Sequence, residues 1–360
     1  MLTNPFLPVV YSVGSLGDNL YKISNTVSAP YGTPPGERSV EQLLKSSVIV
    51  INKQAGPSSH QVAAWLRDSF ELKQTGHGGT LDPNVTGVLP ISIGRASKVI
   101  KVMQESSKEY VCLMKHGKDP GKNRIAEMFT KFTGPLYQIP PLQAAVKREL
   151  RIRRVYEIEM LEHKSQSTLF RVECEGGTYI RNLCSDIGSA LGSGAHMEQL
   201  IRTKSGPFTL EDSVSLIDAH DKYKKWNDSG DSSHISSILK PLESMLVDLP
   251  LIDVKDSAVD ALCHGADLGF PGVVSVSKSM KRGQLVTVGT TRGEAIALAR
   301  ATVDADEIAN NPKSKGKVAR LERVIMKRGT YPREWKSKCC LLYTSDAADE
   351  RSSVDLGGRR

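Results

Sequence analysis

A glycine-rich loop that ends on an aspartate is the stretch of this chain best suited to chemistry. It reads Gly76-His77-Gly78-Gly79-Thr80-Leu81-Asp82-Pro83, and we call it the aspartate loop. Its glycines permit unusual φ values and close backbone approach, while Pro83 biases Asp82 away from helical geometry. Such a loop can hold one carboxylate at a fixed angle before the next strand. A plain Gly-rich turn capped by an aspartate is the alternative without chemistry.

An aromatic residue and a cation could work beside this carboxylate. Tyr110 lies near the start of an apolar strand expected at residues 108–114. Arg181 falls in the first turn of a helix expected at 179–191, off the stripe that passes through Leu183, so it could reach into a cleft. A half-buried strand tyrosine and a solvated surface arginine are the alternatives without function.

A basic run could supply contacts to phosphate groups. The run is Lys147-Arg148-Glu149-Leu150-Arg151-Ile152-Arg153-Arg154. As a strand, it would send Lys147, Arg151 and Arg153 to one face, and a one-sided row of cations suits a nucleic-acid backbone. An edge strand protected by its charges is the alternative. The net charge of +8 also suits a polyanionic partner, although many proteins without one reach it.

The elements that must position these groups mix strands and helices without regular alternation, which favours an α+β fold. A helix is expected to begin at Ser58, because Gln61 three residues later completes a capping box. Its inner face would carry Val62, Leu66 and Phe70. Other expected elements are strands at 47–51 and 88–93, a helix at 94–104, a hairpin of 155–161 with 168–175, and the helix at 179–191 capped by Gly192.

Changes in composition divide the chain into parts. The first residues are rich in Pro, Gly and Ser, which predicts an extended arm, and the polar stretch 218–237 predicts an insertion or linker. After Pro250 the chain changes to short strands with Gly turns, at 284–288 and 294–301, and one short helix around 257–263. The expected parts are an arm (1–45), a larger domain (46–249), a small β-rich module (250–330) and a tail (339–360) that is disordered or not native.

Several classes of protein are excluded by composition. The six cysteines have no C-x-x-C spacing, so we expect no metal site and no redox centre, and reduced thiols fit a reducing compartment. The N-terminus has no basic segment followed by an apolar run, and no stretch approaches roughly eighteen apolar residues. We therefore expect an intracellular protein without a membrane partner.

These residues together resemble the TruB family of pseudouridine synthases, most closely its archaeal and eukaryotic Cbf5/dyskerin branch. The resemblance covers about residues 30–336. Besides the aspartate loop, matching stretches include Gly56-Pro57-Ser58-Ser59-His60, Thr86-Gly87-Val88-Leu89-Pro90, Lys108-Glu109-Tyr110-Val111, Pro140-Pro141-Leu142, Gly177-Thr178-Tyr179-Ile180-Arg181 and Arg202-Thr203-Lys204-Ser205-Gly206-Pro207-Phe208. The module at 250–330 resembles the PUA domain of this branch, through His264-Gly265-Ala266-Asp267-Leu268 and Lys281-Arg282-Gly283.

The resemblance implies an isomerase that converts uridine in RNA to pseudouridine, with a mixed-sheet catalytic domain and no cofactor or metal. It implies that Asp82 is the catalytic aspartate, that Tyr110 stacks on the flipped base and helps to move its C5 proton, and that Arg181 pairs with the carboxylate. Expected substrate contacts are Lys53, His77, Gly79 and Leu200, the last as a wall of the uracil pocket. Expected RNA contacts are Lys147, Arg148, Arg151, Arg153, Arg154, Lys281 and Arg282.

Two departures from the family pattern affect local loop shape. Members commonly have Asp-Lys-Pro where this chain has Asn52-Lys53-Gln54, and His-x-Asp where it has His116-Gly117-Lys118-Asp119. Neither departure touches the aspartate loop. The residues leave open whether Asp82 attacks C6 of the base, attacks C1′ of the sugar, or removes the C2′ proton.

The implied partners are tRNA, rRNA and a box H/ACA guide RNA, together with Nop10, Gar1 and L7Ae-type proteins, but not DNA. Two substrates stay open: uridine 55 of the tRNA T-arm without a guide, and rRNA within the guide-RNA particle. An idle RNA-binding scaffold of the same fold is the alternative, and the set Asp82, Tyr110 and Arg181 favours the enzyme. The absence of a long Lys-rich tail favours an archaeal source, hence the cytoplasm; a eukaryotic source would imply the nucleolus.

Overall fold

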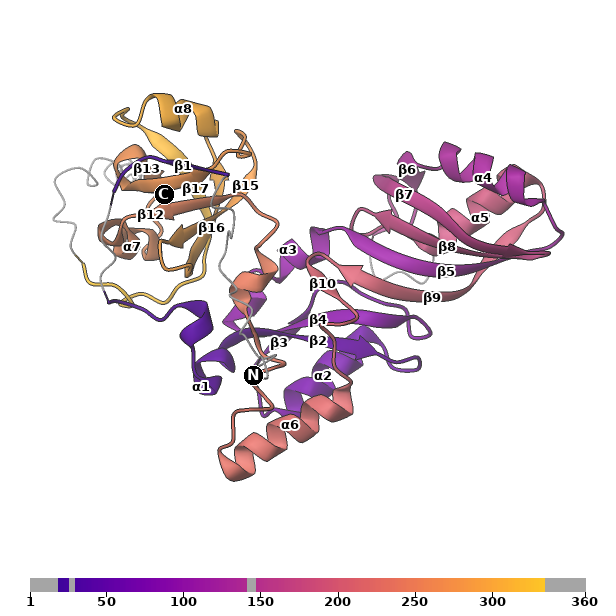
Figure 1. Cartoon of the computed structure of the whole chain (residues 1–360), viewed down its shortest axis with the longest axis horizontal. Helices are drawn as coiled ribbons and strands as arrows, with labels where there is room; N and C mark the ends of the chain where they lie inside the picture. The colour runs from indigo at the N-terminus through magenta and orange to yellow at the C-terminus, as the bar shows by residue number, and fades with distance from the viewer. Residues whose placement is uncertain (1–18, 26–29, 141–146, 334–360) are drawn as a thin grey trace, which may run out of the picture.

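The computed structural model describes residues 19–25, 30–140 and 147–333, which form two mixed sheets with helices packed on them (Figure 1). The larger sheet has ten strands and the smaller has seven. Strands and helices do not alternate regularly, which confirms the expected α+β class. None of the described helices is both long and apolar enough to cross a bilayer. The tail at 339–360 lies outside the described residues.

The larger sheet has the order β11-β2-β4-β9-β5-β8-β7-β6, with β3 paired to β4 and β10 to β9. Among its described pairs only β4 and β9 run parallel. Its strands are β2 (Ser46–Lys53), β3 (Thr75–His77), β4 (Thr86–Gly94), β5 (Lys108–His116), β6 (Gly134–Gln138), β7 (Arg151–Lys164), β8 (Ser167–Cys174), β9 (Ala195–Ser205), β10 (Phe208–Thr209) and β11 (Lys240–Pro241).

The helices beside this sheet begin where the sequence supplies caps. Ser58 and Gln61 form the expected capping box, and Gly192 ends its helix with φ 65° in the left-handed region that glycine tolerates. Both predictions are confirmed. The helices are α1 (Val40–Leu43), α2 (Ser59–Ser69), α3 (Ile100–Glu105), α4 (Lys122–Lys131), α5 (Ile180–Leu191) and α6 (Leu216–Ser229), with short 3₁₀ turns at Pro35–Glu37, Arg95–Lys98 and Leu242–Met245.

Strand β2 is buried on both faces, which explains its nearly continuous apolar run. Ile49 and Ile51 belong to a core with residues of α2 and α6. Val48 and Val50 face the opposite core, which also contains residues of α3 and of the smaller sheet. A third core lies where α4 and α5 pack on β5 and β8. Strand β2, whose last residue Lys53 bonds to the Pro83 carbonyl at the end of the aspartate loop, is thus held from both sides.

The stretch 218–237, which we expected to be a linker, is mostly helix α6, so that prediction was wrong. Ser215 caps the helix by accepting a hydrogen bond from the Asp218 amide. Tyr223 stacks on Phe70 at the end of α2, with ring centroids 4.5 Å apart. The sequence is so polar that its narrow apolar stripe, through Ala219 and Tyr223, is easily overlooked.

The smaller sheet has the order β1-β14-β12-β15-β16-β17-β13. Its first strand comes from the N-terminal arm, where Leu20 pairs with Ser277 and Lys22 with Ser275. Its elements are β1 (Leu20–Lys22), β12 (Leu251–Val254), α7 (Asp256–Cys263), β13 (Leu268–Gly269), a 3₁₀ turn (Phe270–Gly272), β14 (Val273–Ser277), β15 (Leu285–Thr290), β16 (Ala295–Ala301), α8 (Ala305–Asn310) and β17 (Lys317–Val324).

A buried ion pair joins the arm, the larger sheet and the smaller sheet. Both terminal nitrogens of Arg38 donate to the Glu243 carboxylate at 2.8 Å. The Glu243 side chain is 1% exposed, and it also accepts a hydrogen bond from the Ala295 amide of β16 at 3.1 Å. The Lys98 ammonium adds a bond to the Val324 carbonyl of β17 at 2.9 Å. The two sheets therefore share polar contacts as well as a common core.

Candidate active site

The aspartate loop is pinned to its surroundings on both sides of Asp82. The Leu81 amide donates to Ser59 Oγ at 2.8 Å, and that hydroxyl donates to the Leu81 carbonyl at 3.1 Å. The Val85 amide donates to the Asp82 carbonyl at 3.0 Å. Gly79 has φ 125°, a conformation that side chains rarely adopt. The loop thus holds the Asp82 carboxylate in one place.

Lys53 lies beneath this loop and not among the residues that line the cavity. Its ammonium donates to the carbonyls of Gln54 at 3.0 Å and of Pro83 and Val85 at 2.8 Å. The residue is 1% exposed, and burial lowers the pKa of its ammonium. We expected a substrate contact here; the geometry instead makes Lys53 a support for the backbone around Asp82.

A cavity of about 670 Å³ opens in front of Asp82, and we call it the aspartate cavity. Its volume lies in the range typical of small-ligand sites. The aspartate loop, the start of α5 and strands β5, β7 and β9 all contribute to its walls. The residues expected from the sequence that line it are Gly79, Asp82, Tyr110, Arg151, Arg153, Arg181 and Leu200.

Asp82 and Arg181 form an ion pair within the aspartate cavity. Their side chains are 52% and 42% exposed, so substrate and solvent can reach both. The first turn of α5 is fixed by Gln138, whose side chain accepts from the Tyr179 amide at 2.9 Å and donates to the Tyr179 carbonyl at 3.1 Å. The pair is therefore held by a pinned loop on one side and by an anchored helix start on the other.

Tyr110 forms part of the floor of the cavity and is 8% exposed. Burial raises the pKa of its hydroxyl, while the hydrogen bond and charge of Arg202 act in the opposite direction. Arg202 is 1% exposed; its Nε donates to the Val88 carbonyl at 2.7 Å and its Nη2 to the Gly79 carbonyl at 3.2 Å. Arg202 also lines the cavity, and sequence reasoning did not single it out.

Lys108 is a second cation of the cavity that sequence reasoning missed. Its ammonium donates to the Met103 carbonyl at 2.7 Å and to the Ser106 carbonyl and hydroxyl at 2.6 and 2.9 Å. Burial, and then the charge of Arg202, lower its pKa to about 7. The three oxygen contacts hold the Lys108 amino group against the C-terminal end of α3.

His77 lies beside His60 and not among the cavity-lining residues. The two rings meet edge to face with centroids 4.5 Å apart. Burial, and to a smaller extent the nearby charges of His60 and Arg202, lower the pKa of His77 to about 4. His77 is therefore neutral near pH 7 and sits at the start of the aspartate loop.

The basic run does not form one strand from Lys147, so that part of the prediction was wrong. Strand β7 begins at Arg151, because its edge partner β6 ends there with Gln138 paired to Arg151. Arg151 and Arg153 line the aspartate cavity. The other three basic side chains of the run do not line the cavity. Lys147 forms an ion pair with Glu149, and Arg148 donates a hydrogen bond to the Pro140 carbonyl. The third is Arg154.

Lys281 and Arg282 occupy an exposed turn of the smaller sheet, away from the cavity lining. Arg282 Nε donates to the Thr302 carbonyl at 2.8 Å. The Lys281 ammonium lies 3.9 Å from the Asp306 carboxylate, and 57% of its side chain is exposed. Both cations remain accessible to a polyanion.

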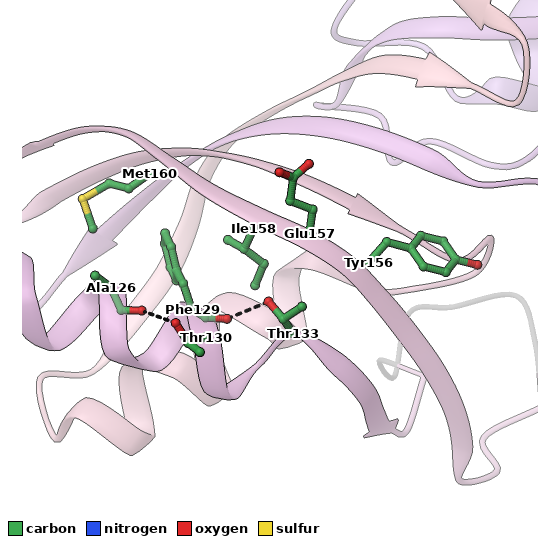
Figure 2. A pocket seen from close by; sticks show the side chains of 8 residues that line it. All are labelled: Ala126, Phe129, Thr130, Thr133, Tyr156, Glu157, Ile158 and Met160. Carbon is green, nitrogen blue, oxygen red and sulfur yellow. Dashed lines mark hydrogen bonds between the residues drawn. The ribbon is translucent and has the colours of Figure 1, made fainter.

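A second hollow, of about 370 Å³, lies between α4 and β7 (Figure 2). Phe129, Ile158 and Met160 give it an apolar wall, and the hydroxyls of Thr130 and Thr133 bond to carbonyls of their own helix. Its titratable residues are Tyr156 and Glu157, without a cation among the lining residues. Among the described residues no group of His, Cys, Asp or Glu could hold a metal ion.

Comparison with known proteins gives four family matches along the chain. They are a DKCLD (NUC011) domain at residues 18–63, the N-terminal domain of the TruB family pseudouridylate synthases at 67–180, the C-terminal domain of tRNA pseudouridylate synthase B at 181–247, and a PUA domain at 250–325.

Similar proteins are found in archaea. A probable tRNA pseudouridine synthase B of Methanocaldococcus jannaschii is 49% identical over 308 residues, which cover 86% of this chain and 91% of that protein. The protein of the same name in Archaeoglobus fulgidus is 46% identical over 321 residues, 89% of this chain and 98% of that protein.

Solved structures match over the same extent. A chain of a Cbf5-Nop10-Gar1 complex is 40% identical, with a TM-score of 0.83, over 89% of this chain and 98% of that chain. A chain of an H/ACA RNP bound to a substrate RNA containing 2′-deoxyuridine is 39% identical, with a TM-score of 0.82, over 88% and 97%.

Proposed function

The chain belongs to the TruB family of pseudouridine synthases, isomerases that convert uridine in RNA to pseudouridine, and we propose that Asp82 is its catalytic aspartate. One observation carries this proposal: the Asp82–Arg181 ion pair opens into a cavity whose floor includes Tyr110. A carboxylate, a cation and an aromatic ring are the three groups that the reaction needs at one place.

The reaction breaks the C1′–N1 bond, turns the uracil and forms a C1′–C5 bond, while the C5 proton leaves and N1 gains one. The base must first leave its stack, because C1′ and C5 are otherwise covered. Stacking on Tyr110, worth about 1–3 kcal/mol per base, would hold the detached uracil while it turns. Leu200 would close the other side of the pocket. The Arg181 guanidinium pairs with the Asp82 carboxylate and would hold it in place beside the substrate.

Two surfaces would hold the RNA outside the cavity. Arg151 and Arg153 line its rim, where a phosphate next to a flipped nucleotide would lie. Lys281 and Arg282 would contact RNA from the smaller sheet, which corresponds to the matched PUA domain. We propose residues 46–249 as the catalytic domain and 250–330 as the PUA domain.

The relatives indicate which substrate and partners to test. Two are named probable tRNA pseudouridine synthase B, and the solved structures are of a Cbf5-Nop10-Gar1 complex and of an H/ACA RNP with substrate RNA. We infer that this chain is the catalytic subunit of such a guide-RNA particle, acting on rRNA with Nop10, Gar1 and an L7Ae-type protein. Uridine 55 of tRNA is the second substrate. The modification of RNA would take place in the cytoplasm of an archaeon or in the nucleolus of a eukaryote.

An assay of the purified protein tests both substrates. Transcripts of tRNA and fragments of rRNA are incubated with and without guide RNA and partner proteins, and pseudouridine is mapped chemically. We expect product on rRNA only with the guide and partners, and product on tRNA without the guide. RNA binding without product under every condition would favour the idle scaffold. The Asp82→Asn chain serves as the blank.

A further inference from the structure

An irregularity between β5 and β9 decides where the Arg202 side chain points. Lys108 pairs with Ser205 and Glu109 with Lys204, but Tyr110 pairs with Arg202, so Thr203 is an extra residue on β9. Without it Tyr110 would face Thr203, and Arg202 would point to the opposite side of the sheet, because side chains alternate along a strand. Bulges of this kind are frequent beside active sites, where they re-aim a side chain.

The guanidinium placed by this bulge has two hydrogen-bond acceptors, and neither of them is a carboxylate. Nε and Nη2 donate to the carbonyls of Val88 and Gly79, and the guanidinium charge acts on the Tyr110 hydroxyl, whose side chain lies on the same face of the sheet and lines the same cavity. Among the described residues the structure records no ion pair for Arg202. A buried cation without a counter-ion destabilises a fold, so packing alone is a poor reason for an arginine here.

We propose that Arg202 is a positioning residue of the isomerisation, which orients the Tyr110 hydroxyl from an anchor on the Val88 and Gly79 carbonyls so that this hydroxyl can accept the C5 proton. This inference rests on the proposed function, in which Asp82 attacks and Tyr110 faces the turned uracil. The C5–H bond breaks and its electron pair restores the ring, while the phenol oxygen accepts the C5 proton and passes its own proton to a water molecule.

The groups around Tyr110 explain why a cation is needed. Arg202 faces it from β9, Cys174 from β8 and Asp82 from the aspartate loop. Burial, Cys174 and Asp82 all raise the pKa of the hydroxyl, and the Arg202 guanidinium lowers it. Lys108, two residues before Tyr110, is committed to Met103 and Ser106. Among these groups Arg202 is therefore the one that favours release of the proton from the Tyr110 hydroxyl.

A double-mutant cycle tests the inference. Single-turnover rates are measured on RNA carrying uridine or 5-deuterouridine for four chains: wild type, Arg202→Lys, Tyr110→Phe and the double variant. Arg202→Lys should slow the reaction about 10- to 100-fold, at or below the lower end of proton-transfer effects, because it changes the positioning of the hydroxyl and not the hydroxyl itself. In the Tyr110→Phe background the same change should slow it less than about twofold, because coupled residues are not additive. The C5 isotope effect should grow in Arg202→Lys.

A matched control and a second variant guard against a folding defect. Arg171→Lys makes the same change on β8, where Arg171 bonds to Glu109, Glu157 and Glu159, and should leave the rate unchanged. If Arg202→Lys does not fold, Arg202→Gln is measured in its place. If neither folds, ¹³Cζ-tyrosine NMR of wild-type protein, assigned with Tyr110→Phe, should show the Tyr110 resonance of a strongly hydrogen-bonded phenol.

Three outcomes overturn the inference. They are equal slowing by Arg202→Lys in both backgrounds, an unchanged C5 isotope effect, and a free phenol in the NMR spectrum. Failure of the proposed function looks different: Asp82→Asn would then form product at the wild-type rate. An inactive Asp82→Asn chain together with additive Arg202 and Tyr110 effects would refute only the role of Arg202.

Discussion

Two of the arginine–carboxylate pairs in the described residues lie in opposite surroundings. Arg181 and Asp82 have side chains that are 42% and 52% exposed at the mouth of a cavity. Arg38 and Glu243 have side chains that are 13% and 1% exposed at the junction of the two sheets. The second pair is bidentate, and its carboxylate also binds the Ala295 amide.

This difference in exposure means that one ion pair can be broken at a small cost in free energy, whereas the other cannot. Exposed ion pairs contribute about 0–1 kcal/mol, because water replaces either partner. Breaking a buried pair costs about 3–5 kcal/mol, since the remaining charge has no solvent. The Asp82 carboxylate can therefore separate from Arg181 at little cost, whereas Glu243 is fixed.

The largest effect should follow from Asp82→Asn. We expect isomerisation to fall about a thousandfold or more, since removal of a catalytic group that acts in the transition state has effects of this size. Melting temperature should change by about 2 °C or less, because the pair is exposed. Asp68→Asn, which alters the exposed pair with Arg67, is the matched control and should keep full activity. A large loss of stability in Asp82→Asn would contradict the contrast between the two pairs.

Arg38→Met should reverse the pattern. The free energy of unfolding, measured by chemical denaturation, should fall by about 3–5 kcal/mol because Glu243 is left buried and unpaired. Activity per folded molecule should remain within about twofold, since the pair is not part of the aspartate cavity. Arg67→Met, in a pair whose side chains are 44% and 63% exposed, provides the reference. Equal stability of the two variants would show that burial does not decide the cost.

His77 offers an intermediate case, because it is a half-buried group beside the aspartate loop. Its pKa is lowered from 6.5 to about 4, so between these values the unfolded chain binds more protons than the folded chain. Stability is therefore present above pH 6.5 and is lost as the pH falls towards 4. Between pH 7 and pH 5 the melting temperature should drop a few degrees more in wild type than in His77→Asn. His220→Asn, at an exposed position of α6, should behave like wild type.

The smallest effect should come from Lys281 and Arg282, the exposed cations on a turn of the smaller sheet. The double change Lys281→Ala and Arg282→Ala should weaken guide-RNA binding about three- to tenfold at low salt and reduce the salt dependence, because phosphate contacts release counterions. The melting temperature should stay within about 2 °C, since surface changes have small effects. Unchanged affinity in a filter-binding titration at low salt would exclude this turn as an RNA contact.

Much of the fold could be predicted from local patterns. The capping box at Ser58, the glycine cap at Gly192 and the alternation of β5 each depend on residues close in sequence. Helix α6 was missed because it has few apolar residues, and one of them, Tyr223, packs against Phe70, which lies far away along the chain. The start of β7 was misplaced because it depends on the length of its neighbour β6.

The candidate site was predictable in its reacting groups and not in its supports. Asp82, Tyr110 and Arg181 lie in recognisable motifs and line one cavity. Lys53 was expected to contact the substrate. The sequence pattern gives the type of this residue but not the direction of its ammonium, which points to the Pro83 carbonyl. Arg202 escaped notice because a single extra residue, Thr203, turns it to the cavity face, and no periodicity marks a bulge.

The pairing of β1 with β14 has a consequence for the order in which the molecule is made. Leu20 leaves the ribosome long before its partner Ser277 exists, by roughly ten to fifty seconds at about 5–20 residues per second. The larger sheet needs no residue beyond Pro241 and can form during that interval. Completion of the smaller sheet must therefore follow formation of the larger sheet, and deletion of Leu20–Lys22 should disturb the smaller sheet while it leaves the larger one intact.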